Sequence, residues 1–160
     1  MNTPSAVSGA SGERIELKIP ASSQWVRVVR LTVAGVASRL PFGIDAVEDI
    51  KLAVAEAVNN AIQHATPGAQ GDVMVTISLE SDENGLWISV ADEGRVVGDL
   101  NTQIPPPRPD EELPEGGLGL LLIRSLMDEV NHESGPHSDT VVKMFKRLPA
   151  RATAPTSAHA

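Results

Sequence analysis

Apolar positions recur along this chain with two different periods, and the changes of period mark its predicted elements. Strict alternation over residues 14–19 predicts a short strand, ended by the proline that follows. Spacings of three and four residues then predict two helices, a first that ends at residue 40 and a longer one over 45–65. The longer helix opens with Asp45 and Glu48, whose spacing is typical of a capping box.

The second half of the chain predicts two hairpins with a helix between them. Asn84-Gly85 is a strong signal for the tight turn of the first hairpin, and Gly135-Pro136 for the turn of the second. A third helix is predicted over residues 119–127. Residues 95–116 before it lack periodicity and are rich in proline, which is typical of a functional lid. The predicted strands of the two hairpins are 73–80, 86–90, 130–133 and 140–148.

This order of elements predicts an α+β fold. We expect a two-layer sandwich with helices on one face of a mixed, mainly antiparallel sheet. The folded domain is expected over residues 13–148. Residues 1–12 and 149–160 are dominated by small and polar residues and are predicted to be disordered tails.

Composition narrows the class of protein. Hydrophobic residues make up 41% of 160, enough for one core, while aromatic residues make up only 2%. The formal charge of −8 argues against a nucleic-acid surface, and the lack of cysteine excludes disulfides and thiolate chemistry. No membrane-spanning run and no signal peptide stand out, so we expect a cytoplasmic protein without membrane contact.

A glycine-rich helix start is the first candidate for chemistry. Gly117 and Gly119 open the apolar third helix, where backbone N–H groups are unpaired and the helix dipole is positive. Glycine lets a polyphosphate approach these groups closely, although a plain helix start explains the glycines equally well. The chain has no Gly-Lys-Ser/Thr and no third glycine of a dinucleotide fingerprint, which excludes two other nucleotide motifs.

Glu56 and Asn60 form a second candidate. They lie four residues apart on the same side of the long helix. A carboxylate beside an amide oxygen suits a magnesium–phosphate site, because Mg²⁺ prefers hard oxygen ligands. A solvated helix face is the alternative.

Asp92 and Gly94 follow a predicted strand and form a third candidate. The carboxylate can accept a hydrogen bond from an exocyclic amine, and the glycine lets a flat ring lie against the backbone. Ordinary turn residues are the alternative here. Thr140, on the last predicted strand, can form a hydrogen bond with a base or a water. The β-propensity of threonine explains its presence there equally well.

Three motifs in order resemble those of the histidine-kinase-like ATPases. Residues 56–65, Glu-Ala-Val-Asn-Asn-Ala-Ile-Gln-His-Ala, resemble the N-box of that family. Asp92-Glu93-Gly94 resembles its first glycine box, and Gly117-Leu118-Gly119-Leu120 its second. Residues 117–130 resemble, more narrowly, the bacterial anti-sigma factor serine kinases. The resemblance covers residues 15–148 and implies the Bergerat ATP-binding fold.

The resemblance also implies a role for each matching residue. Glu56 would activate the substrate hydroxyl, and Asn60 would bind Mg²⁺. Asp92 would meet the adenine amine above Gly94, supported by Thr140. The phosphates of ATP would lie on Gly117, Leu118 and Gly119, and partner contacts would involve Arg30 or its neighbour Arg27. The cation that meets the γ-phosphate stays open, with Arg108 as one candidate.

The implied function is an anti-sigma factor with protein serine kinase activity. It would use Mg-ATP to phosphorylate a serine of an anti-anti-sigma partner, and it would be a homodimer. Val96 and Glu115 depart from the family pattern, which leaves open a non-catalytic, ATP-gated module that sequesters a sigma factor or a response regulator. The catalytic domain of a sensor histidine kinase is a third, weaker hypothesis, because the sequence before Ile15 is too short for a phosphoacceptor helix.

Overall fold

The computed structural model describes residues 12–64, 73–92, 117–134 and 140–150. Within them, five strands form one sheet in the order β1-β2-β3-β5-β4, and every neighbouring pair is antiparallel. The strands are β1 (Arg14–Pro20), β2 (Met74–Ser81), β3 (Gly85–Ala91), β4 (Glu129–Ser134) and β5 (Thr140–Arg147). The helices are the short η1 (Ser23–Trp25), then α1 (Val26–Ala37), α2 (Ile44–His64) and α3 (Gly117–Leu126).

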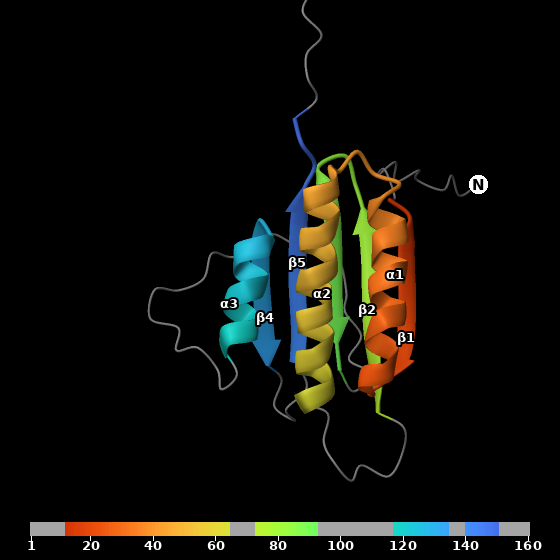
Figure 1. Ribbon diagram of the computed structural model, residues 1–160, viewed down its shortest axis with the longest axis vertical. Helices are drawn as coiled ribbons and strands as arrows, with labels where there is room; N and C mark the ends of the chain where they lie inside the picture. The colour runs from red at the N-terminus through yellow and green to blue at the C-terminus, as the bar shows by residue number, and fades with distance from the viewer. Residues whose placement is uncertain (1–11, 65–72, 93–116, 135–139, 151–160) are drawn as a thin grey trace, which may run out of the picture.

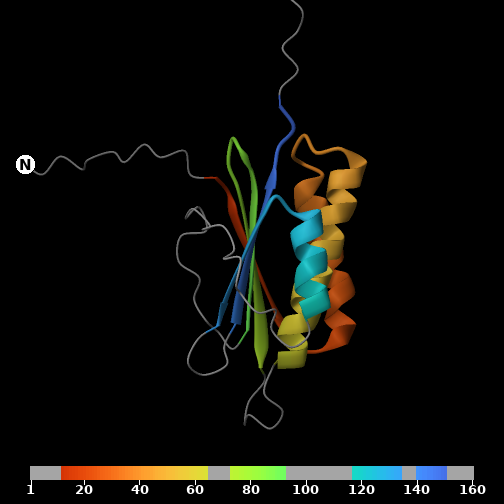
Figure 2. The same ribbon diagram turned by 90° about the vertical axis from the view of Figure 1, so that its left-hand side faces the viewer.

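The three α-helices cover one face of the sheet, and none of them lies on the other face (Figures 1 and 2). The prediction of a two-layer α+β sandwich is therefore confirmed. The sheet is antiparallel throughout its described strands rather than mixed. The predicted lid over residues 95–116 and the turn at Gly135-Pro136 lie outside the described residues.

The core between the two layers is aliphatic, as the low aromatic content requires. It combines the inward stripes of α1 and α2 with alternate residues of the strands. A smaller apolar cluster lies on the opposite face of the sheet, where the rings of Trp87 and Phe145 have centroids 4.3 Å apart. All seven residues of β3 are therefore buried. The largest fully buried side chains are Ile50, Ile77, Leu79, Leu86, Ile88, Ile123 and Met144.

Several predicted element ends differ from the structure by one to three residues; α1 ends at Ala37 rather than at residue 40, and α3 begins at Gly117 rather than at 119. Two of the differences have a clear cause. β1 includes Pro20, because the Ala21 N–H donates to the Val73 carbonyl, so the alternating pattern turns the nitrogen of Pro20 away from β2. α2 begins at Ile44, and the Val47 N–H donates to the carbonyl of Gly43. Asp45 therefore lies within the first helical turn and is not the capping residue. Its negative charge there interacts favourably with the positive end of the helix dipole.

The turn between β2 and β3 depends on Asp82, which the sequence pattern did not single out. Its carboxylate accepts hydrogen bonds from the N–H groups of Asn84 and Gly85, and from the indole of Trp87. Gly85 has a separate constraint, since a Cβ there would lie 2.2 Å from the Lys146 carbonyl oxygen and 2.6 Å from the Phe145 ring. The Asn84-Gly85 signal thus reflects packing against β5 as well as the turn.

We expect Gly85→Ala to lower the free energy of unfolding by about 3 kcal/mol, because the added methyl group overlaps backbone that cannot move freely. Urea denaturation followed by circular dichroism measures the change. Gly35→Ala is the matched control, because a Cβ at this position of α1 meets nothing within 4 Å. The free energy of unfolding of this control should rise by up to about 1 kcal/mol, because alanine favours the helix more than glycine does. Equal stabilities for the two variants would contradict the packing.

Candidate functional site

The candidate site lies at one end of the molecule, where four elements meet. The last turns of α2, the first turn of α3, the end of β3 and the start of β5 all lie at the lower end in Figure 1. Antiparallel pairing of β3 with β5 puts the C-terminus of one strand beside the N-terminus of the other. Segments distant in sequence therefore converge here.

Asn60 of α2 and Gly119 of α3 lie close together where the two helices meet. A Cβ built on Gly119 would lie 3.0 Å from Nδ2 and 3.2 Å from Oδ1 of Asn60. A larger residue at 119 would therefore press on the amide, which would have to shift. Glycine at this position brings the first turn of α3 against the polar face of α2.

Glu56 lies one helical turn before Asn60 and is half-buried. Gly117 and Leu118 are the first two residues of α3, and the Leu118 side chain is 83% exposed. The first N–H groups of a helix lack helical partners. Carboxylate, amide and helix start therefore lie in one region, the combination that binds anionic ligands together with a hard cation.

Asp92 and Thr140 form a buried polar pair at the adjoining strand ends. The Thr140 N–H donates to Oδ1 of Asp92 over 2.6 Å, and the Thr140 hydroxyl donates to Oδ2 over 2.9 Å. The Asp92 N–H in turn donates to the Thr140 carbonyl over 3.2 Å. Asp92 has no exposed surface, and these bonds orient its carboxylate while each oxygen keeps one lone pair free of them.

Lys146 anchors the far end of α3, and the sequence analysis did not identify it. Its ammonium donates to the Leu126 carbonyl over 2.6 Å and to Oδ2 of Asp49 on α2 over 3.2 Å. A cation at a helix C-terminus pairs with the last carbonyls and the dipole. The signal was available, because Lys146 continues the inward alternation of Val142 and Met144 along β5.

The donor atoms fit magnesium only together with phosphate. Among the described residues, no three His, Cys, Asp or Glu side chains are grouped so as to hold a metal ion. Asn60 and Glu56 offer hard oxygen atoms next to a helix start. This fits Mg²⁺, which commonly takes one or two protein ligands and completes its shell with phosphate and water.

The other predicted site residues are only partly covered by the structure. Arg27 and Arg30 are exposed on α1. Gly94 and Arg108 lie outside the described residues. His64 ends α2.

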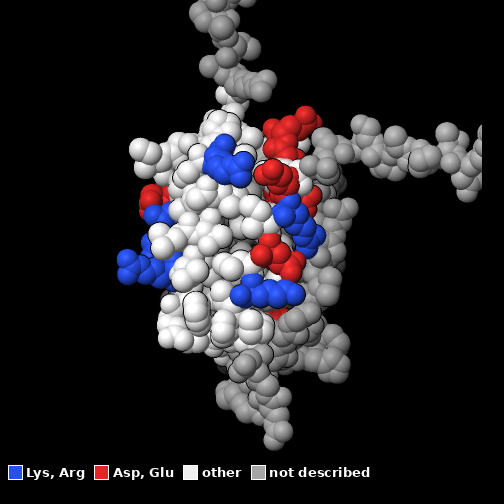
Figure 3. Space-filling model, turned by 90° about the vertical axis from the view of Figure 1, so that its right-hand side faces the viewer, with Lys and Arg blue, Asp and Glu red and all other residues white. Residues whose placement is uncertain are grey.

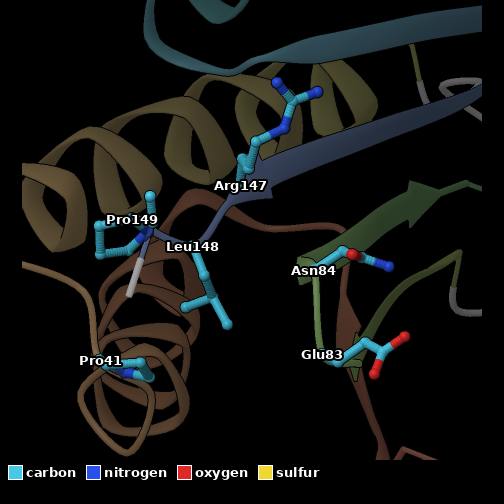
Figure 4. A pocket seen from close by; sticks show the side chains of 7 residues that line it. Pro41, Glu83, Asn84, Arg147, Leu148 and Pro149 are labelled. Atoms are coloured by element: carbon cyan, nitrogen blue, oxygen red, sulfur yellow. The ribbon is translucent and has the colours of Figure 1, made fainter. Parts of the chain in front are cut away.

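A separate surface cavity lies at the opposite end of the sheet. Its volume is about 630 Å³, and it lies between the β2–β3 turn and the segment after β5. Figure 4 shows Glu83 and Asn84 on one side, Pro41 and Leu148 on the other. It shares no residue with the candidate site. The lining residues are Pro41, Glu83, Asn84, Arg147, Leu148, Pro149 and Ala150.

Comparison with known proteins connects this geometry to a family. The model of the histidine kinase-like ATPase domain matches residues 19–146, most of the chain. The chain belongs to this ATPase family. The serine-protein kinase RsbW of Bacillus cereus strain AH820 is 43% identical over 130 residues, which cover 77% of this chain and 80% of the relative. RsbW of Bacillus thuringiensis strain Al Hakam is 44% identical over 131 residues.

A solved structure shares the fold of the ATPase domain. It contains the RsbU and RsbW domains of Rv1364c from Mycobacterium tuberculosis, with a TM-score of 0.58 and 23% identity. The match covers 87% of this chain and 34% of that longer chain. The predicted membership among the serine kinases of the histidine-kinase-like ATPases is confirmed. None of the helices in the described ranges is long and apolar enough to cross a membrane.

We expect Gly119→Ala to weaken binding of Mg-ATP about 10- to 100-fold, because the new methyl group displaces the Asn60 amide. Isothermal titration calorimetry measures the affinity. Gly43→Ala is the control, since a Cβ there meets nothing within 4 Å, and it should bind normally. Unchanged affinity in Gly119→Ala would show that the contact with Asn60 has no part in binding.

Thr140→Val should lower the free energy of unfolding by about 1–3 kcal/mol, because it leaves Oδ2 of the buried Asp92 without its hydroxyl donor. Thr140→Ser keeps the donor and should remain close to the parent protein. Urea denaturation distinguishes the two variants. If valine and serine were equally tolerated, the hydroxyl would not be holding the carboxylate.

Proposed function

We propose that this chain binds Mg-ATP and transfers the γ-phosphoryl group to a serine of an anti-anti-sigma protein. The same chain also holds a sigma factor. Phosphorylation of the anti-anti-sigma protein determines which of these two proteins the chain binds. The contact between Asn60 and Gly119 supports this proposal best. The two motifs expected to bind metal and phosphate lie so close there that a Cβ on Gly119 would be 3.0 Å from Asn60, although the residues are 59 positions apart in the sequence.

Glu56 is the proposed general base. Its carboxylate is half-buried beside Asn60, and in the described parts of the chain no Lys or Arg forms an ion pair with it. Glu56 would accept the serine proton while the serine oxygen attacks the γ-phosphorus, giving phosphoserine and ADP.

The remaining residues bind and orient in this proposal. Asn60 holds Mg²⁺ through its amide oxygen, and the N–H groups at the start of α3, from Gly117 to Gly119, bind phosphate oxygens. Asp92, oriented by Thr140, accepts from the adenine amine, and Gly94 lies beneath the base. Magnesium held at Asn60 would supply positive charge to the transferring phosphoryl group.

The partners are proteins, and no nucleic acid or membrane contact is proposed. Arg30 and Arg27 are exposed on α1, where they can meet acidic groups of a partner. Sigma factor and anti-anti-sigma factor are the proposed partners. A homodimer and a cytoplasmic location are part of the same proposal.

We expect Glu56→Gln to lower phosphorylation of a purified anti-anti-sigma protein by about 10²–10⁴-fold, because glutamine cannot accept the serine proton. Single-turnover assays with radiolabelled ATP measure transfer, and calorimetry should show that ATP still binds. Glu48→Gln is the matched control. It changes an exposed glutamate of the same helix and should leave transfer unchanged.

Loss of ATP binding together with transfer in Glu56→Gln would make Glu56 structural rather than catalytic. Nucleotide binding by the parent protein without transfer to any tested partner would favour the non-catalytic, ATP-gated module instead.

A further inference from the structure

The C-terminal end of α3 is held to β5 by several hydrogen bonds. The Lys146 ammonium donates to the carbonyl of Leu126, the last residue of the helix. In the corner that follows, the Asp128 N–H donates to the Phe145 carbonyl over 3.0 Å, and the Arg147 N–H donates to Oδ2 of Asp128 over 2.7 Å. Three consecutive residues of β5 therefore fix this end of the helix.

α3 also meets α2 through polar groups at both of its ends. The two helices run in opposite directions, as the colours of Figure 1 show. At the C-terminal end of α3, Lys146 donates to Oδ2 of Asp49 on α2 over 3.2 Å. At the N-terminal end, Gly119 lies close to Asn60 of the same helix. The ion pair and the glycine thus set the two ends of α3 against one neighbour.

The Lys146 ammonium is withdrawn from water, unlike the charges on the edge strand. Its side chain is 15% exposed, whereas Lys18 in an ion pair of β1 is 62% exposed. On the side of the molecule away from α3, Figure 3 shows charged groups of both signs on the surface. Exposed ion pairs contribute little to stability, and a buried pair is often no more stabilising than an apolar residue of similar size. Stability alone therefore does not explain a lysine at position 146.

The helix carries the position of this anchor to the candidate site. α3 has 10 residues, so its first and last residues lie about 14 Å apart along the axis, at a rise of about 1.5 Å per residue. A tilt of about 10° at Leu126 would therefore move the first turn by about 2 Å. An N–H···O hydrogen bond spans only about 2.7–3.2 Å, so a shift of this size would break bonds to a ligand.

We propose that Lys146 is a positioning residue for the polyphosphate half of the nucleotide. Through Leu126 and Asp49 it sets where the first N–H groups of α3 stand relative to Asn60. This inference rests on the proposed function, because it takes those N–H groups to bind phosphate.

The adenine half of the site has a different support. Asp92 and Thr140 are joined by their own hydrogen bonds and by the pairing of β3 with β5. Lys146 therefore controls the affinity for the phosphates and not the affinity for the base.

Replacing the ammonium separates the two halves. Lys146→Met keeps an unbranched apolar side chain, and we expect it to raise the dissociation constant of Mg-ATP about tenfold while that of adenosine stays unchanged. Calorimetry measures Mg-ATP, and an NMR titration measures the weaker adenosine. Lys146→Arg keeps a cationic donor and should restore most of the affinity. Lys143→Met is the matched control, because position 143 lies on the other face of the same strand, and it should bind both ligands normally.

Spectra without nucleotide test the placement of α3 directly. In Lys146→Met, the signals of the Gly119 backbone amide and the Asn60 side-chain amide should shift, while that of the Asp92 backbone amide stays in place. Asp49→Asn breaks the ion pair from α2 and should weaken Mg-ATP binding about threefold, because Lys146 keeps its bond to Leu126. Circular dichroism reports folding, and if Lys146→Met does not fold, Asp49→Asn provides the test.

Three outcomes would overturn this inference. Equal losses of Mg-ATP and adenosine affinity would make Lys146 a general structural residue. Unchanged Mg-ATP affinity in Lys146→Met would remove its role and leave the proposed function standing. Unshifted Gly119 and Asn60 signals would show that Lys146 does not place α3. A parent protein that binds no Mg-ATP would instead contradict the proposed function, and the spectra without nucleotide would still decide whether Lys146 places the helix.

Discussion

The missing side chain of Gly119 is the constraint on which the candidate site depends. A Cβ at position 119 would lie 3.0 Å from the Asn60 amide, so glycine lets α3 approach α2 without displacing that side chain. That approach brings the start of one helix, with its unpaired N–H groups, beside the polar residues of another. Without this contact, Glu56 and Asn60 are only a solvated helix face, and the glycines only a helix start.

The rest of the fold supports that contact from both sides. Lys146 connects β5 to the last carbonyl of α3 and to Asp49 of α2, which fixes α3 at the end remote from Gly119. At the site itself, the Asp92–Thr140 pair joins the ends of β3 and β5 through buried hydrogen bonds. Buried polar groups are costly unless they are satisfied, so these pairs favour one relative placement of strands and helices.

Much of this was predictable from the sequence, because periodicity, turn residues and motif order are local signals. They predicted every α-helix and strand of the described residues, the two layers and the family. The failures have tertiary causes. Pro20 belongs to β1 because its nitrogen faces the open edge, and Lys146 matters because α3 ends above it. The pairing of β1 and the place where α3 ends are tertiary facts, although the alternation along β5 already marked Lys146 as facing the helices. The roles of Glu56 and Asn60 remain predictions, since they depend on bound nucleotide.

The most direct test of the nucleotide site is a two-dimensional NMR titration of the labelled protein with a non-hydrolysable Mg-ATP analogue. The account predicts that the Asn60 side-chain amide and the backbone amides of Gly119 and Thr140 shift together with one dissociation constant. Asn84 and Arg147, at the opposite end, should stay unchanged. Shifts confined to that opposite end, or separate affinities for Asn60 and Gly119, would contradict the account.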